Sequence, residues 1–225
     1  MNLVITTCSR PTAYLGQTLG SMYLADPKAH EFKLHFFIDG ENRAAAKNFL
    51  HNGKPKFVVN ADRDRGELQY PPNQRVTRNL AHALKSFPLD EELLIAEDDL
   101  LFRDEWVDEM RKCIDAAQSR SERYILSLYC PWELRGHPIV QLDARVTPFY
   151  GNLLLYIPST VRHELADYMV NRAVELPGDL LVRDWGWSTN TPIFASVPSL
   201  VQHAGHDSSL GTKGGKSPMF PVIEP

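Results

Sequence analysis

The chain has 225 residues, of which 43% are hydrophobic and 23% are charged, and its formal net charge is −4. These values are ordinary for a soluble globular protein, and the length suits one large α/β domain with a sizeable core. They exclude the strong overall basic charge of a non-specific nucleic-acid binder, although a local basic groove stays open. No stretch approaches the ~18 apolar residues of a membrane-spanning helix.

The first half of the chain alternates strand-like and helix-like segments. Residues 3–8 (LVITTC) predict a first strand, and Ser9 and Pro11 then suit the first turn of a helix. Further strands are predicted at 33–40, 56–61 and 92–102, and further helices at 44–52 and 75–87. This order predicts a single α/β domain with a mainly parallel, Rossmann-like sheet flanked by helices. Ligands of such sheets bind at the carboxyl ends of the strands.

The second half is less regular. Asp104 is predicted to cap a helix, and Ser159 to open another. Strands are predicted within 123–132 and 149–159, a last strand and loop within 193–209, and a short helix or turn within 178–187. The tail is rich in Gly, Pro and Lys and is expected to form a mobile loop or lid. We expect a nucleotide-binding half, an acceptor and catalytic half, and a tail over residues 1–102, 103–210 and 211–225.

Three adjacent acids, Glu97, Asp98 and Asp99, follow the apolar strand run LLIA. Such acids can hold a hard divalent ion, form an acid and base pair, or cap the next turn. On a continuous strand, Glu97 and Asp99 would point to one side and Asp98 to the other, which suits an ion. The residues alone leave capping and metal binding equally open. Because Mg²⁺ and Mn²⁺ often complete their ligand shell with phosphate oxygens, a metal-bound nucleotide diphosphate is the joint hypothesis.

Several motifs occur in an order that resembles GT-A-fold glycosyltransferases. They are VITTCSRPTAYLGQTLGSM, IDG, QRVTRNLAHAL, LLIAEDDLLF and PSLVQHAGHDSSLG. The EDD triplet looks like the DxD-type motif of these enzymes. The last segment resembles one found in N-acetylglucosaminyltransferase IV type enzymes and in small microbial and viral transferases. The resemblance implies a GT-A fold, a UDP-sugar donor and an Mn²⁺ or Mg²⁺ cofactor.

The resemblance also implies roles for individual residues. Strand ends would line the nucleotide through Thr7, Ser9, Arg10 and Asp39. The third helix would approach the base or diphosphate through Arg75, Arg78 and Asn79. Asp99 would be the direct metal ligand and His203 a second metal or diphosphate contact, while Glu97 and Asp98 would serve ribose, sugar hydroxyls or metal-bound water. Asp39 as a turn former and the arginines as a solvated helix face are the structural alternatives.

The catalytic base implied by the resemblance is Asp179, with Asp184 as its rival. A carboxylate that takes the proton of an acceptor hydroxyl, on the face opposite the diphosphate, inverts the anomeric carbon. A simple N-cap would also explain Asp179. Basic groups such as Lys213 and Lys216 would help to neutralise the leaving diphosphate. Trp185 and Trp187 are expected in the core rather than as a sugar platform.

Other functions stay open. A nucleotidyltransferase shares the α/β half and the carboxylate-bound Mg²⁺, but TTCSRPTAY lacks its usual Gly-rich loop. A non-catalytic sugar-nucleotide-binding module is the second rival. The acceptor would be a glycan or a 5-hydroxymethylpyrimidine in phage DNA. The latter needs a basic groove, for which DRDRGELQYPPNQRVTR and the Lys-rich tail are candidates.

The cysteines and the start of the chain bear on location. Cys8, Cys113 and Cys130 are scattered, form no CxxC motif and suit reduced thiols. The start, MNLVITTCSRP, shows no secretory pattern. We therefore expect a location in the cytoplasm of a bacterium or of a virus-infected host cell.

Overall fold

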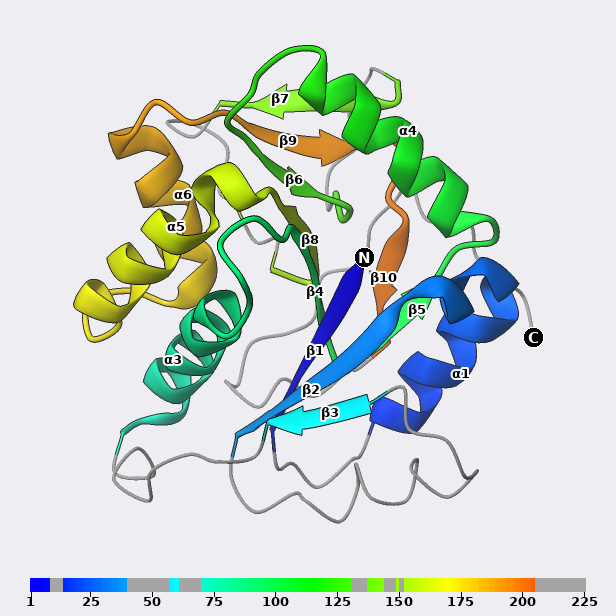
Figure 1. The fold of residues 1–225 in the computed structure, drawn as a ribbon, viewed down its shortest axis with the longest axis horizontal. Helices are drawn as coiled ribbons and strands as arrows, with labels where there is room; N and C mark the ends of the chain where they lie inside the picture. The colour runs from blue at the N-terminus through cyan, green and yellow to red at the C-terminus, as the bar shows by residue number, and fades with distance from the viewer. Residues whose placement is uncertain are drawn as a thin grey trace.

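The computed structural model describes residues 1–8, 14–39, 57–60, 70–130, 137–143, 149 and 152–204 (Figure 1). The strands are β1 (Asn2–Cys8), β2 (Lys33–Asp39), β3 (Phe57–Asn60), β4 (Leu93–Glu97), β5 (Leu100–Phe102), β6 (Ile125–Ser127), β7 (Ile139–Leu142), β8 (Leu154–Ile157), β9 (Ile193–Ser196) and β10 (Val201–His203). The helices are α1 (Leu15–Ala25), the 3₁₀ helix η1 (Pro27–Glu31), α3 (Pro72–Lys85), α4 (Trp106–Gln118), α5 (Ser159–Arg172) and α6 (Gly178–Ser188).

The main sheet of the described residues has eight strands in the order β3-β2-β1-β4-β8-β6-β9-β7. All of its strands run parallel to β1 except β8 and β7, so the predicted mainly parallel sheet is confirmed. The strand order reverses between β1 and β4, because β2 and β3 lie on one side of β1 and β4 lies on the other. Ligands of open α/β sheets bind at such a switch point, beyond the carboxyl ends of the strands. We call that edge of the sheet the carboxyl edge.

Helices cover both faces of the sheet, with α1 and α4 on one side and α3, α5 and α6 on the other (Figure 1). Alternate residues of β1 enter the two resulting cores: Leu3 and Ile5 pack with the α1 and α4 side, and Val4 with the other. A strand buried on both faces needs apolar residues at successive positions. This explains why the strands read as unbroken hydrophobic runs.

The prediction of one strand over 92–102 was wrong. The main-sheet strand β4 ends at Glu97, the chain bends at Asp98 and Asp99, and β5 pairs instead with β10 in a separate two-stranded sheet. The last predicted strand is likewise divided into β9 and β10 around Pro198, which has no N–H to continue a ladder. The predicted helix at 44–52 lies outside the described residues.

The start of α4 also differs from the prediction. Asp104 lies in a turn, and the residue before the helix, Glu105, has a left-handed φ of 59° and no side-chain cap. The buried Asp26 supplies the missing acceptor from a distant segment: its Oδ2 accepts from the Val107 N–H at 3.1 Å. Its Oδ1 accepts from the Lys28 N–H at 2.9 Å, so the Asp26 carboxylate caps the first turns of both η1 and α4. Tertiary contact replaces the local cap that the sequence predicted.

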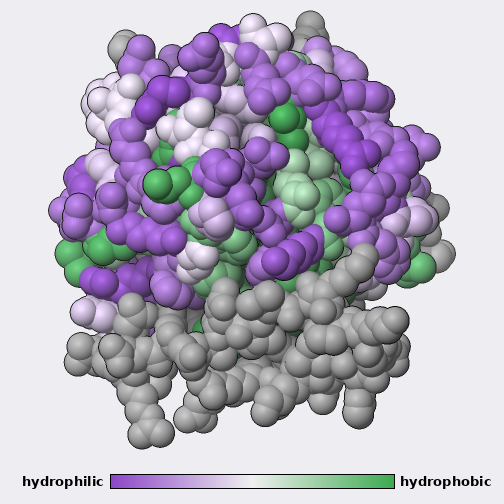
Figure 2. Space-filling model, viewed as in Figure 1, coloured by the Kyte–Doolittle hydropathy of each residue, from purple (hydrophilic) through white to green (hydrophobic). Residues whose placement is uncertain are grey.

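Among the coloured residues in Figure 2, hydrophilic ones predominate, with smaller hydrophobic areas between them. The large hydrophobic side chains that remain exposed come from several elements and include Leu24, Leu89, Val174 and Trp187. None of the helices among the described residues is both long enough and apolar enough to cross a membrane.

A buried histidine makes the fold sensitive to acid. His35 in β2 is 3% exposed, and its Nε2 lies 2.9 Å from Asn2 Oδ1. Asn2 Nδ2 donates to Glu91 at 2.7 Å, so Oδ1 faces the ring and Nε2 carries the proton. Within the described residues Nδ1 is buried with no hydrogen-bond partner, so a second proton would be buried unpaired. Burial, aided by nearby Lys33, lowers the pKa of His35 to about 4.

The unfolded chain therefore binds this proton between pH 6.5 and about 4 while the folded chain does not. Stability is complete above pH 6.5 and falls as the pH drops towards 4, by roughly 2–3 kcal/mol from this group. His35→Gln, which keeps a donor for Asn2, is expected to flatten that loss. Urea unfolding of wild type and variant at pH 7 and pH 4.5 measures it. The exposed His82→Gln is the matched control, and equal acid sensitivity of His35→Gln and wild type would contradict the assignment.

Candidate metal centre and active site

The three acids form a turn at the switch point, and a hydroxyl from α1 holds it. Thr18 Oγ1 donates to the Asp98 carbonyl at 2.7 Å and accepts from the Leu100 N–H at 2.8 Å. Thr18 is fully buried, so water does not compete for these bonds. The Thr18 side chain thus stabilises the bend between the end of β4 and the start of β5. The bend directs the side chains of Glu97 and Asp99 to the carboxyl edge.

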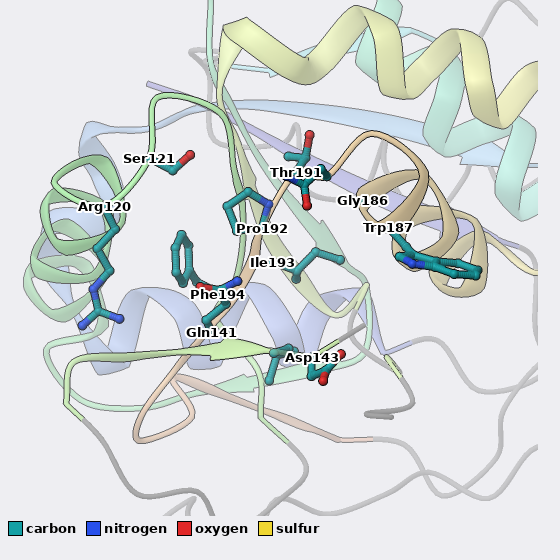
Figure 3. A pocket seen from close by; sticks show the side chains of 12 residues that line it. Arg120, Ser121, Gln141, Asp143, Gly186, Trp187, Thr191, Pro192, Ile193 and Phe194 are labelled. Atoms are coloured by element: carbon teal, nitrogen blue, oxygen red, sulfur yellow. The ribbon is translucent and has the colours of Figure 1, made fainter. Parts of the chain in front are cut away.

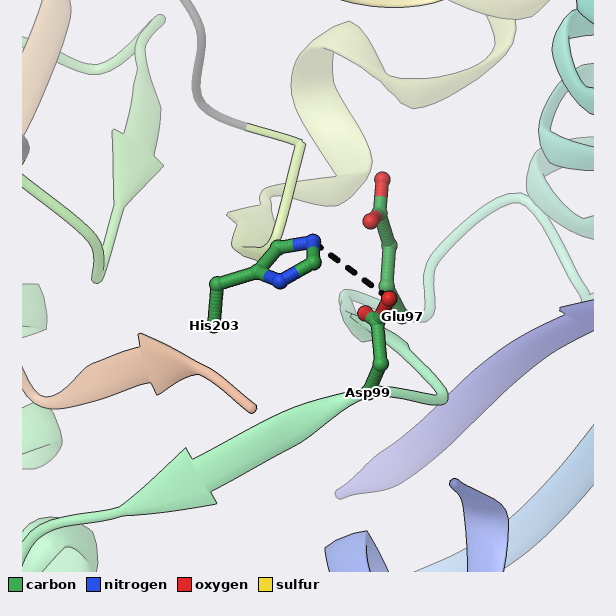
Figure 4. A group of neighbouring side chains, drawn as sticks. All are labelled: Glu97, Asp99 and His203. Carbon is green, nitrogen blue, oxygen red and sulfur yellow. Dashed lines mark ion pairs between the residues drawn. The ribbon is translucent and has the colours of Figure 1, made fainter. Parts of the chain in front are cut away.

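His203 reaches the same place from the other end of the chain. β10 runs antiparallel to β5, with His203 opposite Leu100, and the Ala204 N–H donates to the Asp99 carbonyl at 2.7 Å. His203 Nε2 lies 3.3 Å from Asp99 Oδ2 (Figure 4). The pairing of two short strands therefore fixes the histidine beside the acid turn.

Glu97, Asp99 and His203 could hold a metal ion together. Each offers one ligand atom, and these atoms all lie within 4.8 Å of one another. Asp99 is 2% exposed, and Glu97 and His203 are both partly buried, so the centre is partly shielded from water. Two carboxylate oxygens and one imidazole nitrogen suit a divalent ion of the Mn²⁺ type better than Mg²⁺, which prefers oxygen alone.

Two of the residues predicted to line the nucleotide contact each other. Thr7 Oγ1, near the end of β1, donates to Asp98 Oδ2, and both side chains are buried. This bond ties the end of β1 to the acid turn across the switch point. Asp98 thus has a contact within the protein, and Glu97 and Asp99 are the acids that meet His203.

The residues predicted on α3 are divided between core and surface. Asn79 is 3% exposed and donates to the Phe37 carbonyl of β2 at 2.9 Å, so it fixes the helix to the sheet. Arg78 lies over the Tyr70 ring, with 4.2 Å from the guanidinium carbon to the ring centroid. Arg75 and Arg78 belong to the first turns of α3, which begins at the carboxyl edge because it follows β3 and precedes β4. The two arginines are therefore near enough to that edge to remain candidates for phosphate contact.

Asp179 lies at the start of α6, directly after Gly178, where the helix packs closely against neighbouring side chains. A Cβ on Gly178 would lie 3.1 Å from Asn152 Nδ2 and 3.4 Å from Thr77 Oγ1, so the glycine lets α6 approach closely. The residue after Asn152, Leu153, accepts from the Glu97 N–H at 2.9 Å through its carbonyl. Burial raises the pKa of Asp179, although its Oδ1 accepts from the Leu180 N–H at 2.9 Å. A raised pKa makes this carboxylate a stronger proton acceptor.

Asp184, the rival base, is held against α5. Its Oδ2 accepts from Tyr168 at 2.6 Å and lies 2.7 Å from Arg172 Nη1. Both partners belong to α5, so the carboxylate serves the contact between α5 and α6. This arrangement favours Asp179 over Asp184 as the base.

Several predicted site residues lie outside the described residues. They are Ser9, Arg10, Lys213 and Lys216, and the tail with its predicted lid. Asp39 is the last residue of β2, at the carboxyl edge, but its side chain is likewise outside the description.

Two functional positions escaped the sequence interpretation. Thr18 lies among Leu15, Leu19 and Met22 on the buried face of α1, where a hydroxyl stands out and could have been noticed. Asn152 lies just before β8, and no pattern in the neighbouring sequence marked it as a site residue. Among the described residues, its buried Oδ1 has no hydrogen-bond partner, and it lies beside Gly178.

The mainly parallel sheet flanked by helices agrees with the GT-A fold that the motifs predicted. Solved structures agree. Two structures of LgtC match, one described as an active-site mutant and one as the galactosyltransferase with donor and acceptor sugar analogs. They have TM-scores of 0.55 and 0.54 and identities of 14% and 15%, and each match covers 82% of this chain and 70% of LgtC.

A structure of GalNAc-T7 with UDP, GalNAc and Mn²⁺ matches with a TM-score of 0.59 and 11% identity. The match covers 90% of this chain but 43% of GalNAc-T7, so this chain spans less than half of that protein. No family model and no curated protein sequence matches the chain. At these identities the likeness establishes the fold alone.

Proposed function

We propose that the protein is a metal-dependent glycosyltransferase that moves a sugar from a UDP-sugar donor to an acceptor hydroxyl. The observation that carries the proposal is the group of Glu97, Asp99 and His203 at the switch point of a GT-A fold. UDP and Mn²⁺ are named for the GalNAc-T7 structure, and donor and acceptor sugar analogs for one of the LgtC structures. These names support the donor class and the metal.

Asp99, Glu97 and His203 would hold the ion, preferably Mn²⁺. The bound ion would supply positive charge to the diphosphate, which becomes more negative as the glycosidic bond breaks. The protein's part is to keep the two carboxylates in a fixed arrangement. Thr18 and the β5–β10 pairing provide that fixation, which lowers the reorganisation needed during reaction.

Asp179 would accept the proton of the attacking hydroxyl. It lies at the start of α6, and the raised pKa of its carboxyl suits a general base. We propose inversion at the anomeric carbon, because a base on the face opposite the diphosphate gives that outcome. An NMR assignment of the product anomer tests it, and retention would remove Asp179 from this role.

The acceptor is proposed to be a glycan. The formal net charge of −4 does not favour DNA, whose binding depends on basic groups that contact phosphates. A 5-hydroxymethylpyrimidine in phage DNA remains the second acceptor to test, since the segment DRDRGELQYPPNQRVTR and the tail contain basic residues.

The decisive experiment incubates the protein with a panel of nucleotide sugars and Mn²⁺, first alone and then with glycans or hydroxymethylated DNA. We expect slow hydrolysis of one UDP-sugar and transfer to a glycan, both lost with EDTA. Pyrophosphate release from a nucleoside triphosphate would instead identify a nucleotidyltransferase. Donor binding without turnover would identify a binding module.

Asp179→Asn is expected to keep UDP binding and to lower transfer by about 10²–10⁴-fold, since an amide cannot accept the proton. Asp184→Asn is the matched control on the same helix and is expected to keep transfer within a few fold. Calorimetric UDP titration and a transfer assay separate binding from chemistry. Selective loss of transfer in Asp184→Asn would reassign the base.

A further inference from the structure

A pocket opens at the edge of the sheet opposite the carboxyl edge. It is lined at the beginning of β9, at the end of β7, at the end of α6 and at the turn after α4, and its volume is about 590 Å³ (Figure 3). β4 and β6 both pair antiparallel with β8, and β9 pairs parallel with β6, so β9 runs in the same direction as β4. The beginning of β9 therefore lies at the end of the sheet opposite Glu97. The pocket is therefore separate from the metal centre. Its size is within the ~300–1,000 Å³ typical of small-molecule sites.

An exposed indole lies on the wall of this pocket. Trp187 is 59% exposed, whereas Trp185, two residues earlier on α6, is 1% exposed. The expectation that both tryptophans belong to the core was therefore right for Trp185 and wrong for Trp187. A single exposed hydrophobic residue needs no explanation by itself. An exposed indole in a polar pocket is different, because its flat face can stack on the C–H groups of a sugar ring.

The other lining groups are polar and mixed in character. Gln141 offers an amide, Arg120 a guanidinium and Asp143 a carboxylate, while the Ser121 hydroxyl is used by the Arg123 backbone. Arg120 lies over the Phe194 ring, 5.9 Å from its guanidinium carbon to the ring centroid, so its head group stays at the rim. Together they provide both donors and acceptors of hydrogen bonds, with one positive and one negative charge. Sugar hydroxyls, which both donate and accept, need this mixture.

The chain holds Trp187 in place by a rigid turn. Asn190 has a φ of 54°, which Asn tolerates better than most residues, and its N–H donates to the Trp187 carbonyl at 3.2 Å. The Thr191 N–H donates to the Gly186 carbonyl at 2.8 Å. This bond pattern closes the end of α6 as a Schellman motif. The pocket wall is therefore preformed, which lowers the entropy that a ligand must remove.

Gly186 brings this turn close to the sheet. A Cβ at that position would lie 3.1 Å from Ile193 Cδ1 and 3.1 Å from the Thr191 carbonyl oxygen. A larger residue would push the end of α6 away from β9. Gly186 thus sets the distance between the indole and the strand that forms the pocket floor.

We propose that this pocket is a second carbohydrate site, which binds a neutral oligosaccharide away from the metal centre. A phosphorylated ligand needs several cations, and the pocket has one guanidinium opposed by a carboxylate. A wholly apolar ligand would bury the Gln141 amide and the Arg120 guanidinium against apolar groups. The exposed indole with mixed polar groups matches a neutral sugar chain. This site goes beyond the proposed transfer reaction and does not depend on it.

The test is binding of the protein to an array of neutral oligosaccharides in EDTA, without any donor, followed by surface plasmon resonance on the glycans bound. We expect wild type to bind, and Trp187→Ala to weaken binding about tenfold or more, which corresponds to ~1.4 kcal/mol. Gln141→Ala is expected to weaken it by several fold. Leu24→Ala, which removes another exposed hydrophobic side chain, is the matched control and should bind as wild type does.

The Asp99→Ala variant separates the two sites. It is expected to keep oligosaccharide binding while losing metal-dependent UDP binding, so failure of either proposal can be seen without the other. Absence of binding to every neutral glycan, or binding unchanged in both Trp187→Ala and Gln141→Ala, would overturn the proposal. Binding lost in Asp99→Ala but kept in Trp187→Ala would place the sugar at the metal centre and also overturn it.

Discussion

Replacing Asp99 by alanine is expected to abolish Mn²⁺-dependent UDP binding and to lower sugar transfer by about 10³-fold. Asp99 is the acid whose carboxylate lies 3.3 Å from His203 Nε2 and whose carbonyl accepts from the Ala204 N–H. Loss of the carboxylate leaves Glu97 and His203 as the remaining ligands of the group. Two ligands hold a divalent ion too weakly to bind the diphosphate with it. Calorimetric titration of UDP, with and without Mn²⁺, measures the effect.

Asp99→Asn keeps the shape of the buried side chain and separates loss of charge from loss of fold. Thermal unfolding of both variants should resemble that of wild type in EDTA. The exposed Asp115→Ala on α4 is the control for a general effect of removing an acid. Mn²⁺-dependent UDP binding that survives in both Asp99 variants would disprove the metal assignment.

The largest effect on stability is expected from Arg162→Met. Arg162 on α5 is 0% exposed, and its Nε donates to the Glu91 carbonyl at 2.9 Å. Its guanidinium also donates to the carbonyls of Leu84, Phe87 and Pro88. These carbonyls belong to the end of α3 and the loop after it, where the helix dipole favours a positive charge. Methionine fills similar volume but removes all of these bonds and leaves the Leu84 and Phe87 carbonyls without this buried donor, which costs about 3 kcal/mol or more.

Urea unfolding measured by circular dichroism gives that free energy. Arg123→Met is the matched control, because Arg123 also contacts α5, through Glu164 at 2.6 Å, but its side chain is 46% exposed. An exposed pair of this kind contributes about 0–1 kcal/mol. Equal destabilisation by the two substitutions would contradict the capping role of Arg162.

Much of the fold could be predicted from local patterns. Apolar runs such as LVITTC and LLIA identified β1 and β4, because a strand buried on both faces needs apolar residues at successive positions. The amphipathic segment from 75 to 87 identified most of α3. The boundaries were less accurate. Asp104 looked like a helix cap, but Asp26 supplies that contact from a distant segment.

The candidate site was predicted in part, for a clear reason. Glu97 and Asp99 stood out as acids after a strand, and the resemblance added His203. Their mutual placement was predicted from the two-residue period of a continuous strand, whereas the structure brings them together by a bend. The contact of Thr7 with Asp98, which uses one of the predicted acids within the protein, has no signature in the sequence.

By itself, the sequence determined the α/β alternation, the apolar strands and the position of the acids at a strand end. These three features depend on residues that are close together in the sequence, because side-chain periodicity and turn-forming residues determine them. Only the tertiary structure decided that β10 pairs with β5, that Gly178 lets α6 approach Asn152, and that Trp187 is exposed beside a pocket rather than buried in the core. Each of these depends on which distant segments meet, and this is set by how the whole set of buried surfaces packs together.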